Sequence, residues 1–192
     1  MKASAFSYAR ATSVGNAIEL LVAHGDRAKV LSGGQSLVPA LNLRLLSPDL
    51  IVDIGALREL RGITIEGGLV RVGALTRHSE LLTSAELAVH APLIVEAVAH
   101  VAHPAIRNRG TIGGSLAHAD PAAELPACMV ALNATIIVVG PFGERRIAAK
   151  DFFKGIYETD LTPHELLVAV EWPVPANNSA HFFCEFARRN GD

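Results

Sequence analysis

The sequence predicts an α+β fold in two lobes. Its apolar segments are mostly short strands that outnumber the helices, and several strands pair as hairpins, which disfavours a doubly wound sheet. Half of the 192 residues are apolar and 19% are charged, so the chain can bury a core without disulfides. Two glycine-rich turns, one early and one near the middle, suggest lobes over residues 1–55 and 56–192, with a ligand in the cleft between them.

The first lobe carries helices and strands with clear boundary signals. Ser13 is suited to cap the first helix and Gly25 to end it, while Pro39 must sit in the first turn of the second helix. The expected elements are helices over residues 14–24 and 37–46 and strands over residues 28–31 and 50–54.

The second lobe begins with the clearest element of the chain, a hairpin over residues 63–72 that alternates around Gly67 and Gly68. Thr76 is expected to cap the next helix, and Asp120 to cap a later one, in which Pro126 is either an interruption or the true start of the helix. The remaining expected elements are helices over residues 76–82, 92–102 and 121–132 and strands over residues 135–139, 145–148, 166–171 and 180–188.

Composition excludes several classes of protein. The net charge is −2 and the sequence has no basic tract, which argues against nucleic-acid binding. No apolar run reaches the roughly 18 residues of a membrane span, and the N-terminus lacks the apolar core of a signal peptide. Cys128 and Cys184 lie far apart and outside any CxxC, which argues against a disulfide framework or a zinc site. We expect a cytoplasmic protein whose many apolar residues form a buried core and an interface with a partner subunit.

Two related turns are the strongest functional signal. Residues Leu31 to Leu37 and Thr111 to Ser115 each contain Gly-Gly near a Ser-Leu pair. A backbone without Cβ atoms can approach a ligand closely, and successive N–H groups in such a turn form a nest for anions. Two such turns could hold a diphosphate, although each can also be a plain turn. Neither matches the G-x-G-x-x-G or Walker pattern.

Other clusters favour ordinary structural explanations. His100 and His103 have the spacing of metal ligands but no third ligand nearby, so a surface pair is the simpler interpretation. Ser115, His118 and Asp120 could suggest a hydrolase triad, yet they lie too close in sequence, and G-x-S-x-G is absent.

Three charged residues near the second turn have two interpretations each. Arg107 and Arg109 could neutralise phosphate or simply be solvated. Glu124 could accept hydrogen bonds from sugar hydroxyls, or act as a favourable charge at a helix N-terminus.

Short motifs run in a fixed order through almost the whole chain. They are Ser32-Gly33-Gly34-Gln35-Ser36-Leu37, Arg44-Leu45, Asp53-Ile54, Gly73-Ala74-Leu75-Thr76, Arg107-Asn108-Arg109-Gly110-Thr111-Ile112-Gly113-Gly114-Ser115, Ala119-Asp120-Pro121, Glu124-Leu125-Pro126, Asp151-Phe152-Phe153, Glu165-Leu166-Leu167 and Arg188-Arg189-Asn190-Gly191-Asp192. With these motifs the chain closely resembles the FAD-binding medium subunit of molybdenum hydroxylases, the carbon monoxide dehydrogenase and xanthine dehydrogenase family.

The resemblance implies a two-lobed FAD-binding fold of the type shared with vanillyl-alcohol oxidase, and non-covalent FAD. It also implies two partners, a large subunit with the molybdenum cofactor and a small subunit with 2Fe-2S clusters. Electrons would pass from the small subunit to FAD and then to an external acceptor. Such a chain needs no catalytic residue and no metal ligand of its own, because the cofactor carries the chemistry.

The resemblance also implies which residues contact the cofactor. The two turns would cradle the diphosphate and ribitol, Val101 would neighbour the adenine or flavin, and Leu167 would be an apolar contact. His118 and Glu124 would be polar contacts, although the family often has Asp at the latter position. The full set is Leu31, Ser32, Gly33, Gly34, Gln35, Ser36, Leu37, Val101, Thr111, Ile112, Gly113, Gly114, Ser115, His118, Glu124 and Leu167.

Family members usually continue past the position of Asp192 with a small domain that helps cover the flavin, so this chain is expected to bind FAD less tightly than a longer one. Two other functions stay open: a self-contained flavin oxidoreductase, and a flavin-free assembly module whose glycine turns only shape the fold.

Overall fold

A three-stranded parallel sheet organises the first part of the chain in the computed structural model, which describes residues 2–176 and 178–187. Its strand order is β1-β3-β2, and helices supply the crossovers that parallel strands require. The elements are β1 (Ser7–Arg10), α1 (Val14–His24), β2 (Ala28–Leu31), α2 (Leu37–Asn42) and β3 (Leu50–Asp53). Helix α2 is shorter than predicted, and Arg44 just beyond it takes a left-handed φ of 59° that a helix cannot continue through.

A five-stranded antiparallel sheet forms the second part, in the order β4-β5-β10-β6-β7. The predicted hairpin is confirmed: Gly67 and Gly68 have φ values of 58° and 77° and link β4 to β5 by a two-residue turn. The strands are β4 (Ile63–Glu66), β5 (Leu69–Gly73), β6 (Thr135–Gly140), β7 (Gly143–Ala148) and β10 (Leu166–Pro173).

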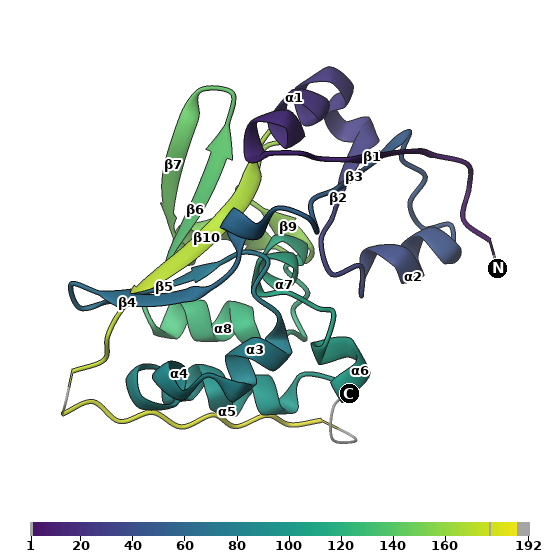
Figure 1. Cartoon of the computed structure of the whole chain (residues 1–192). Helices are drawn as coiled ribbons and strands as arrows, with labels where there is room; N and C mark the ends of the chain where they lie inside the picture. Colours follow the sequence, from purple (N-terminus) through teal and green to yellow (C-terminus); the bar gives the residue numbers. More distant parts are fainter. Residues whose placement is uncertain (1, 177, 188–192) are drawn as a thin grey trace.

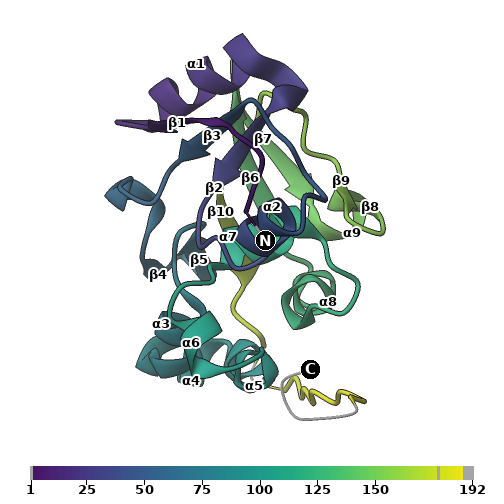
Figure 2. The same ribbon diagram turned by 90° about the vertical axis from the view of Figure 1, so that its right-hand side faces the viewer.

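Both faces of this sheet are used. Ile136 and Val170 face a core made with the helices, while Ile137 and Ala169 face a core shared with the first lobe. The helices are α3 (His78–Thr83), α4 (Ala85–His90), α5 (Pro92–His100), α6 (Pro104–Arg107), α7 (Ile112–His118), α8 (Glu124–Ala131) and α9 (Ala149–Phe152). Helix α1 lies at one end of the molecule and α3 to α6 at the other, with α2 and α7 between them (Figure 1 and Figure 2). No helix in the described ranges is long and apolar enough to cross a membrane.

The prediction of a tight turn at Gly113-Gly114-Ser115 is wrong. These residues form the first turns of α7, where the Oγ1 of Thr111 accepts a hydrogen bond from the N–H of Gly114 (3.1 Å). Ile112 and Leu116 on the same helix are fully buried. Burial of this apolar face outweighs the low helix propensity of the two glycines.

Two predicted helix caps are also wrong. The hydroxyl of Thr76 bonds the backbone of Gly62 instead, and α3 begins one residue later than a Thr76 cap would place it. The Oδ1 of Asp120 accepts from the N–H of Ala122 in a local turn, and α8 starts only at Glu124. Pro126 therefore falls in the first turn of α8, where a missing N–H costs little.

The strand predicted over residues 180–188 is not present in residues 180–187, and Arg188 and the motif that it begins lie outside the described residues. This segment runs along α5 (Figure 1 and Figure 2). The Nε2 of His181 lies 3.1 Å from the Oε1 of Glu96, and the rings of Phe183 and His100 are 5.1 Å apart. A helix presents no strand edge, so the segment has no ladder to join.

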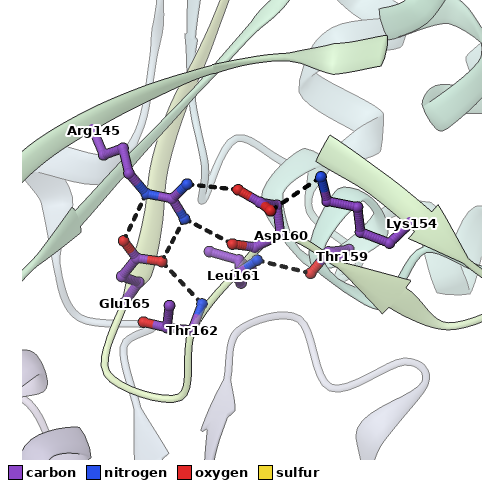
Figure 3. Close-up of polar contacts among 7 residues, drawn as sticks. All are labelled: Arg145, Lys154, Thr159, Asp160, Leu161, Thr162 and Glu165. Atoms are coloured by element: carbon purple, nitrogen blue, oxygen red, sulfur yellow. Dashed lines mark hydrogen bonds and ion pairs between the residues drawn. The ribbon is translucent and has the colours of Figure 1, made fainter. Parts of the chain in front are cut away.

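A cluster of ion pairs fastens the segment between β7 and β10 (Figure 3). Arg145 donates to both carboxylate oxygens of Glu165 (2.9 and 2.8 Å) and to the side chain and carbonyl of Asp160 (2.6 and 2.7 Å). Lys154 pairs with the second oxygen of Asp160 at 3.1 Å, and the N–H of Thr162 donates to Glu165. The same segment contains the short hairpin of β8 (Phe153–Gly155) and β9 (Glu158–Thr159).

Candidate functional site

A cleft of about 810 Å³ opens where the two lobes meet. Its walls come from three places: the ends of the first-lobe strands, the loop before α2, and the segments that flank α3 and α6. The lining residues are Arg10, Leu31, Ser32, Gly33, Gly34, Gln35, Val38, Pro39, Asp53, Gly55, Arg61, Leu75, Arg77, Asn108, Arg109 and Thr111. The structure thus brings most of the first predicted motif and the start of the second into one cavity.

The loop from Ser32 to Ser36 forms one wall as a backbone surface. Gly34 has a φ of 74°, and a Cβ on Gly33 would stand 2.2 Å from the carbonyl oxygen of Arg109, so neither glycine can be replaced without strain or a shift. The amide of Gln35 donates to the carbonyl of Gly33 (2.9 Å) and holds the loop in shape. Within residues 2–176 and 178–187, none of the five backbone N–H groups of this loop has a hydrogen-bond partner. The loop is therefore supplied with donors for an anion.

The two predicted motifs touch each other directly. The hydroxyl oxygens of Ser32 and Thr111 are 2.7 Å apart and share a hydrogen bond. Gly114 lies beside this pair, because a Cβ there would stand 3.0 Å from the Oγ1 of Thr111 and 3.9 Å from the Cβ of Ser32. The expectation that both motifs contribute to one site is supported by this contact.

The second motif does not provide the expected nest of free N–H groups. Ile112 donates to the carbonyl of Thr76, Gly113 to that of Ala74, and Ser115 to that of Thr111, while Gly114 donates to the threonine hydroxyl. Two of these donors therefore bind α7 to the segment that follows β5, and the other two are used by Thr111 at the start of the helix. The second motif therefore shapes the cleft, and the donors come from the first motif.

Charged side chains also line the cleft, and among them the sequence predicted only Arg109 as a possible phosphate contact. Arg10, Arg61, Arg77 and Arg109 contribute four positive charges, and Asp53 contributes one negative charge. Burial raises the pKa of Asp53, but hydrogen bonds from Tyr8 and Gly55 and the charge of Arg10 outweigh it and hold that pKa below its ordinary value. The net charge of the side chains that line the cleft is therefore positive. Sequence spacing could have indicated only Arg109, which directly precedes the second motif.

Ten of the sixteen predicted contacts lie outside the lining of this cleft: Ser36 and Leu37, the α7 residues Ile112, Gly113, Gly114 and Ser115, and four residues further away, Val101, His118, Glu124 and Leu167. Leu167 is buried in the helix-side core, and Val101 ends α5, where its carbonyl accepts from Arg107 (2.8 Å). His118 stacks on Tyr157 with ring centroids 4.9 Å apart. Glu124 lines a second depression of about 650 Å³ together with residues 183–187, and burial raises its pKa. Their contact with a cofactor stays a prediction.

Arg107 matches neither of its two interpretations: it is half-buried, and its guanidinium donates to the carbonyls that end α5, including those of Val101 and Ala102. Across the described residues no group of three His, Cys, Asp or Glu side chains could hold a metal. One buried histidine was not predicted from the sequence: His78 is 6% exposed, and burial lowers its pKa to about 4. Its ring packs against Gly110, just before the second motif: a Cβ added to Gly110 would lie only 3.1 Å from the ring. The low pKa keeps this ring neutral near pH 7.

Comparison with known proteins identifies the family of the chain. A model of the FAD binding domain in molybdopterin dehydrogenase matches residues 4–175. The chain belongs to this family. Among the relatives of this FAD-binding domain are the 6-hydroxypseudooxynicotine dehydrogenase complex subunit alpha of Paenarthrobacter nicotinovorans (46% identical over 100% of this chain and 65% of the relative) and the carbon monoxide dehydrogenase medium chain of Hydrogenophaga pseudoflava (40% over 97% and 65%).

Solved structures agree with the family. The carbon monoxide dehydrogenase of Hydrogenophaga pseudoflava superposes with a TM-score of 0.98 at 40% identity, over 100% of this chain and 67% of the other. Quinoline 2-oxidoreductase from Pseudomonas putida 86 superposes with a TM-score of 0.95 at 45% identity, over 100% and 66%. The predicted resemblance and the α+β FAD-binding fold are therefore confirmed, and the chain spans about two thirds of the length of these relatives.

The cleft fits the diphosphate of FAD on its own geometry. The loop from Ser32 to Ser36 offers N–H donors, Gly34 takes a conformation that a side chain would strain, and the surrounding arginines supply positive charge. A Cβ at Gly33 would meet the backbone of Arg109 and Gly110, and one at Gly34 would meet the side chains of Leu31 and Val38, so both glycines maintain the shape of this loop.

Proposed function

We propose that the chain is the FAD-binding, electron-transfer subunit of a cytoplasmic molybdenum hydroxylase. FAD, when bound, supplies the redox chemistry, taking electrons from an iron–sulfur partner and passing them to an external acceptor. The observation that carries the proposal is the convergence of the two motifs, through the hydroxyls of Ser32 and Thr111, on an arginine-lined cleft.

The chain's own residues bind and orient the cofactor. The loop from Ser32 to Ser36 donates N–H groups to the diphosphate, and the start of α7 sets the width of the site beside Gly114. Val101, His118, Glu124 and Leu167 would contact the rest of the cofactor. This role needs no acid or base, because binding, orientation and exclusion of water are what the protein contributes.

The proposed partners are a large subunit with the molybdenum cofactor and a small subunit with 2Fe-2S clusters. Relatives bear names as different as carbon monoxide dehydrogenase and caffeine dehydrogenase, although their sequences align over nearly the whole of this chain. The substrate is therefore set elsewhere in the assembly, and these residues do not select it.

The first prediction tests cofactor identity by quenching of flavin fluorescence. We expect the purified chain to bind FAD non-covalently and far more tightly than FMN, which lacks the diphosphate. Acid precipitation should release the flavin into the supernatant. Equal affinities for FAD and FMN would contradict the two-motif cradle, and a chain that binds neither would favour a flavin-free assembly module. Flavin that stays with the acid-precipitated protein would favour a covalent flavoenzyme.

A further inference from the structure

The four arginines of the cleft differ in how far their side chains are already engaged. The Nε of Arg10 lies 3.4 Å from the Oδ2 of Asp53, and an Nη of Arg61 donates to the carbonyl of Gly55 at 3.0 Å. These two guanidinium groups support the first-lobe wall of the cleft. The charge of Arg10 is partly offset by Asp53, and one donor of Arg61 is used by the protein backbone.

Arg77 and Arg109 are different. In the part of the chain that the structure describes, neither guanidinium makes a hydrogen bond or an ion pair, although both side chains line the cleft. A guanidinium has five donors in a planar fork that matches two phosphate oxygens, so an unengaged one in a cavity is available for an anion.

The backbones that carry these two side chains are held in place. Arg77 forms an isolated antiparallel bridge with Thr111, and its N–H donates to the carboxylate of Glu80 (2.7 Å). The carbonyl of Arg109 packs directly against Gly33 of the donor loop. One arginine therefore stands beside the second motif and the other beside the first, with the Ser32–Thr111 bond between the motifs.

We propose that Arg77 and Arg109 form a two-arginine clamp on the diphosphate of FAD, acting together with the backbone donors of the loop from Ser32 to Ser36. The proposal rests on the proposed function, since it names the groups that neutralise this cofactor. The diphosphate is a dianion, and two bidentate guanidinium contacts match its charge and its number of oxygens. The clamp would make the site selective for a dinucleotide diphosphate over a neutral flavin.

The test compares the variants R77Q, R109Q and R77Q/R109Q with the matched control R58Q. Arg58 is exposed, lies outside the cleft and makes no ion pair in the described ranges. Dissociation constants for FAD and for uncharged riboflavin are measured by fluorescence quenching on the 192-residue chain, at low and high salt.

Each single variant should weaken FAD binding by about tenfold, and the double variant by about fiftyfold. The double variant should also lose most of the salt dependence of FAD binding, because that dependence reports the charges that meet the phosphates. Riboflavin binding and R58Q should change by less than about twofold.

The outcomes separate this inference from the proposed function. If the parent chain binds no FAD, the proposed function is wrong. If the parent binds FAD and the double variant binds it equally well, or keeps the same salt dependence, the clamp is wrong and the cofactor assignment stands. Equal losses for FAD and riboflavin would also overturn the clamp, because they would indicate a general change in the cleft. R77K and R109K should recover part of the affinity, because lysine restores the charge without the bidentate fork.

Discussion

The ion-pair cluster around Arg145 and the cleft around Arg109 use the same residue type in opposite ways. Arg145 uses four of its five N–H donors on Glu165 and Asp160, and its neighbours Lys154 and Thr162 make further contacts to the same carboxylates (Figure 3). The cleft instead carries an unengaged guanidinium beside a loop of unpaired N–H groups in the described chain. A cluster of paired charges fixes a segment of the fold, whereas a surplus of donors in a cavity indicates a ligand.

The largest expected effect comes from filling the cleft wall at Gly33. A Cβ there would meet the backbone of Arg109 at 2.2 Å and of Gly110 at 2.8 Å, and backbone cannot move aside cheaply. We expect Gly33→Ala to lower the free energy of unfolding by about 3 kcal/mol and to abolish FAD binding. Thermal melts and FAD titration measure the two losses. Gly15→Ala is the control, since its new Cβ would come no closer than 3.8 Å to any atom and should not destabilise the chain. A Gly33→Ala chain that melts with the parent would contradict the close packing of the two loops.

Gly114→Val should separate binding from folding. Gly114 does not take a positive φ, so valine can adopt the helical backbone there without strain. Its Cβ would press on the hydroxyl of Thr111 at 3.0 Å and disturb the link to Ser32. We expect loss of FAD with a melting temperature lowered by only a few degrees, on the order of 1 kcal/mol. Circular dichroism melts beside FAD content measure both.

Two variants of Thr111 control for this interpretation. Thr111→Ser keeps the hydroxyl and should bind FAD normally, while Thr111→Val removes it and should behave like Gly114→Val. If stability and FAD fall in proportion in Gly114→Val, Gly114 has only a structural role.

The smallest effect is expected for Arg145→Gln. Its side chain is 40% exposed, so solvent screening limits the loss to about 1 kcal/mol of unfolding free energy, without a change in FAD affinity. The hydrogen bond from Arg145 lowers the pKa of Asp160 below its ordinary value of 3.8. A carboxylate with a lowered folded-state pKa stabilises the fold above the unfolded value and loses that contribution as pH falls through the folded one. The stability gap between parent and variant should therefore close below about pH 3.8, as urea melts across pH would show. If the difference in unfolding free energy between parent and variant persists in acid, or if the variant loses FAD binding at neutral pH, the purely structural role of Arg145 is contradicted.

Local patterns predicted the elements whose cause is local. The hairpin at Gly67-Gly68 and the helix capped by Ser13 follow from turn and capping chemistry within a few residues, and both are confirmed. The start of α7 was missed because its helical state depends on burying Ile112 and Leu116 against distant strands. A predicted strand at residues 180–187 fails because no sheet edge is available to it.

The candidate site was predictable in its motifs and not in its charges. The pattern around Gly33 and Gly34 indicated a close backbone approach, and the structure has it. Nothing near Arg77 in the sequence indicates the cleft, since that residue reaches it only through its bridge to Thr111. Which donors are free was equally hidden, because the N–H groups of α7 are used by carbonyls of Ala74 and Thr76.

The Ser32–Thr111 bond also has a consequence for the order of folding. It joins residues separated by 79 positions, so it can form only after both lobes have reached nearly their final arrangement. Closing so long a loop has an entropic cost that neither lobe recovers alone. We therefore expect the cofactor cradle to form late in folding, so that FAD does not act as a template for either lobe. It stabilises only the completed chain, by mass action, so free FAD added during refolding should raise the final yield of folded chain without speeding the early steps.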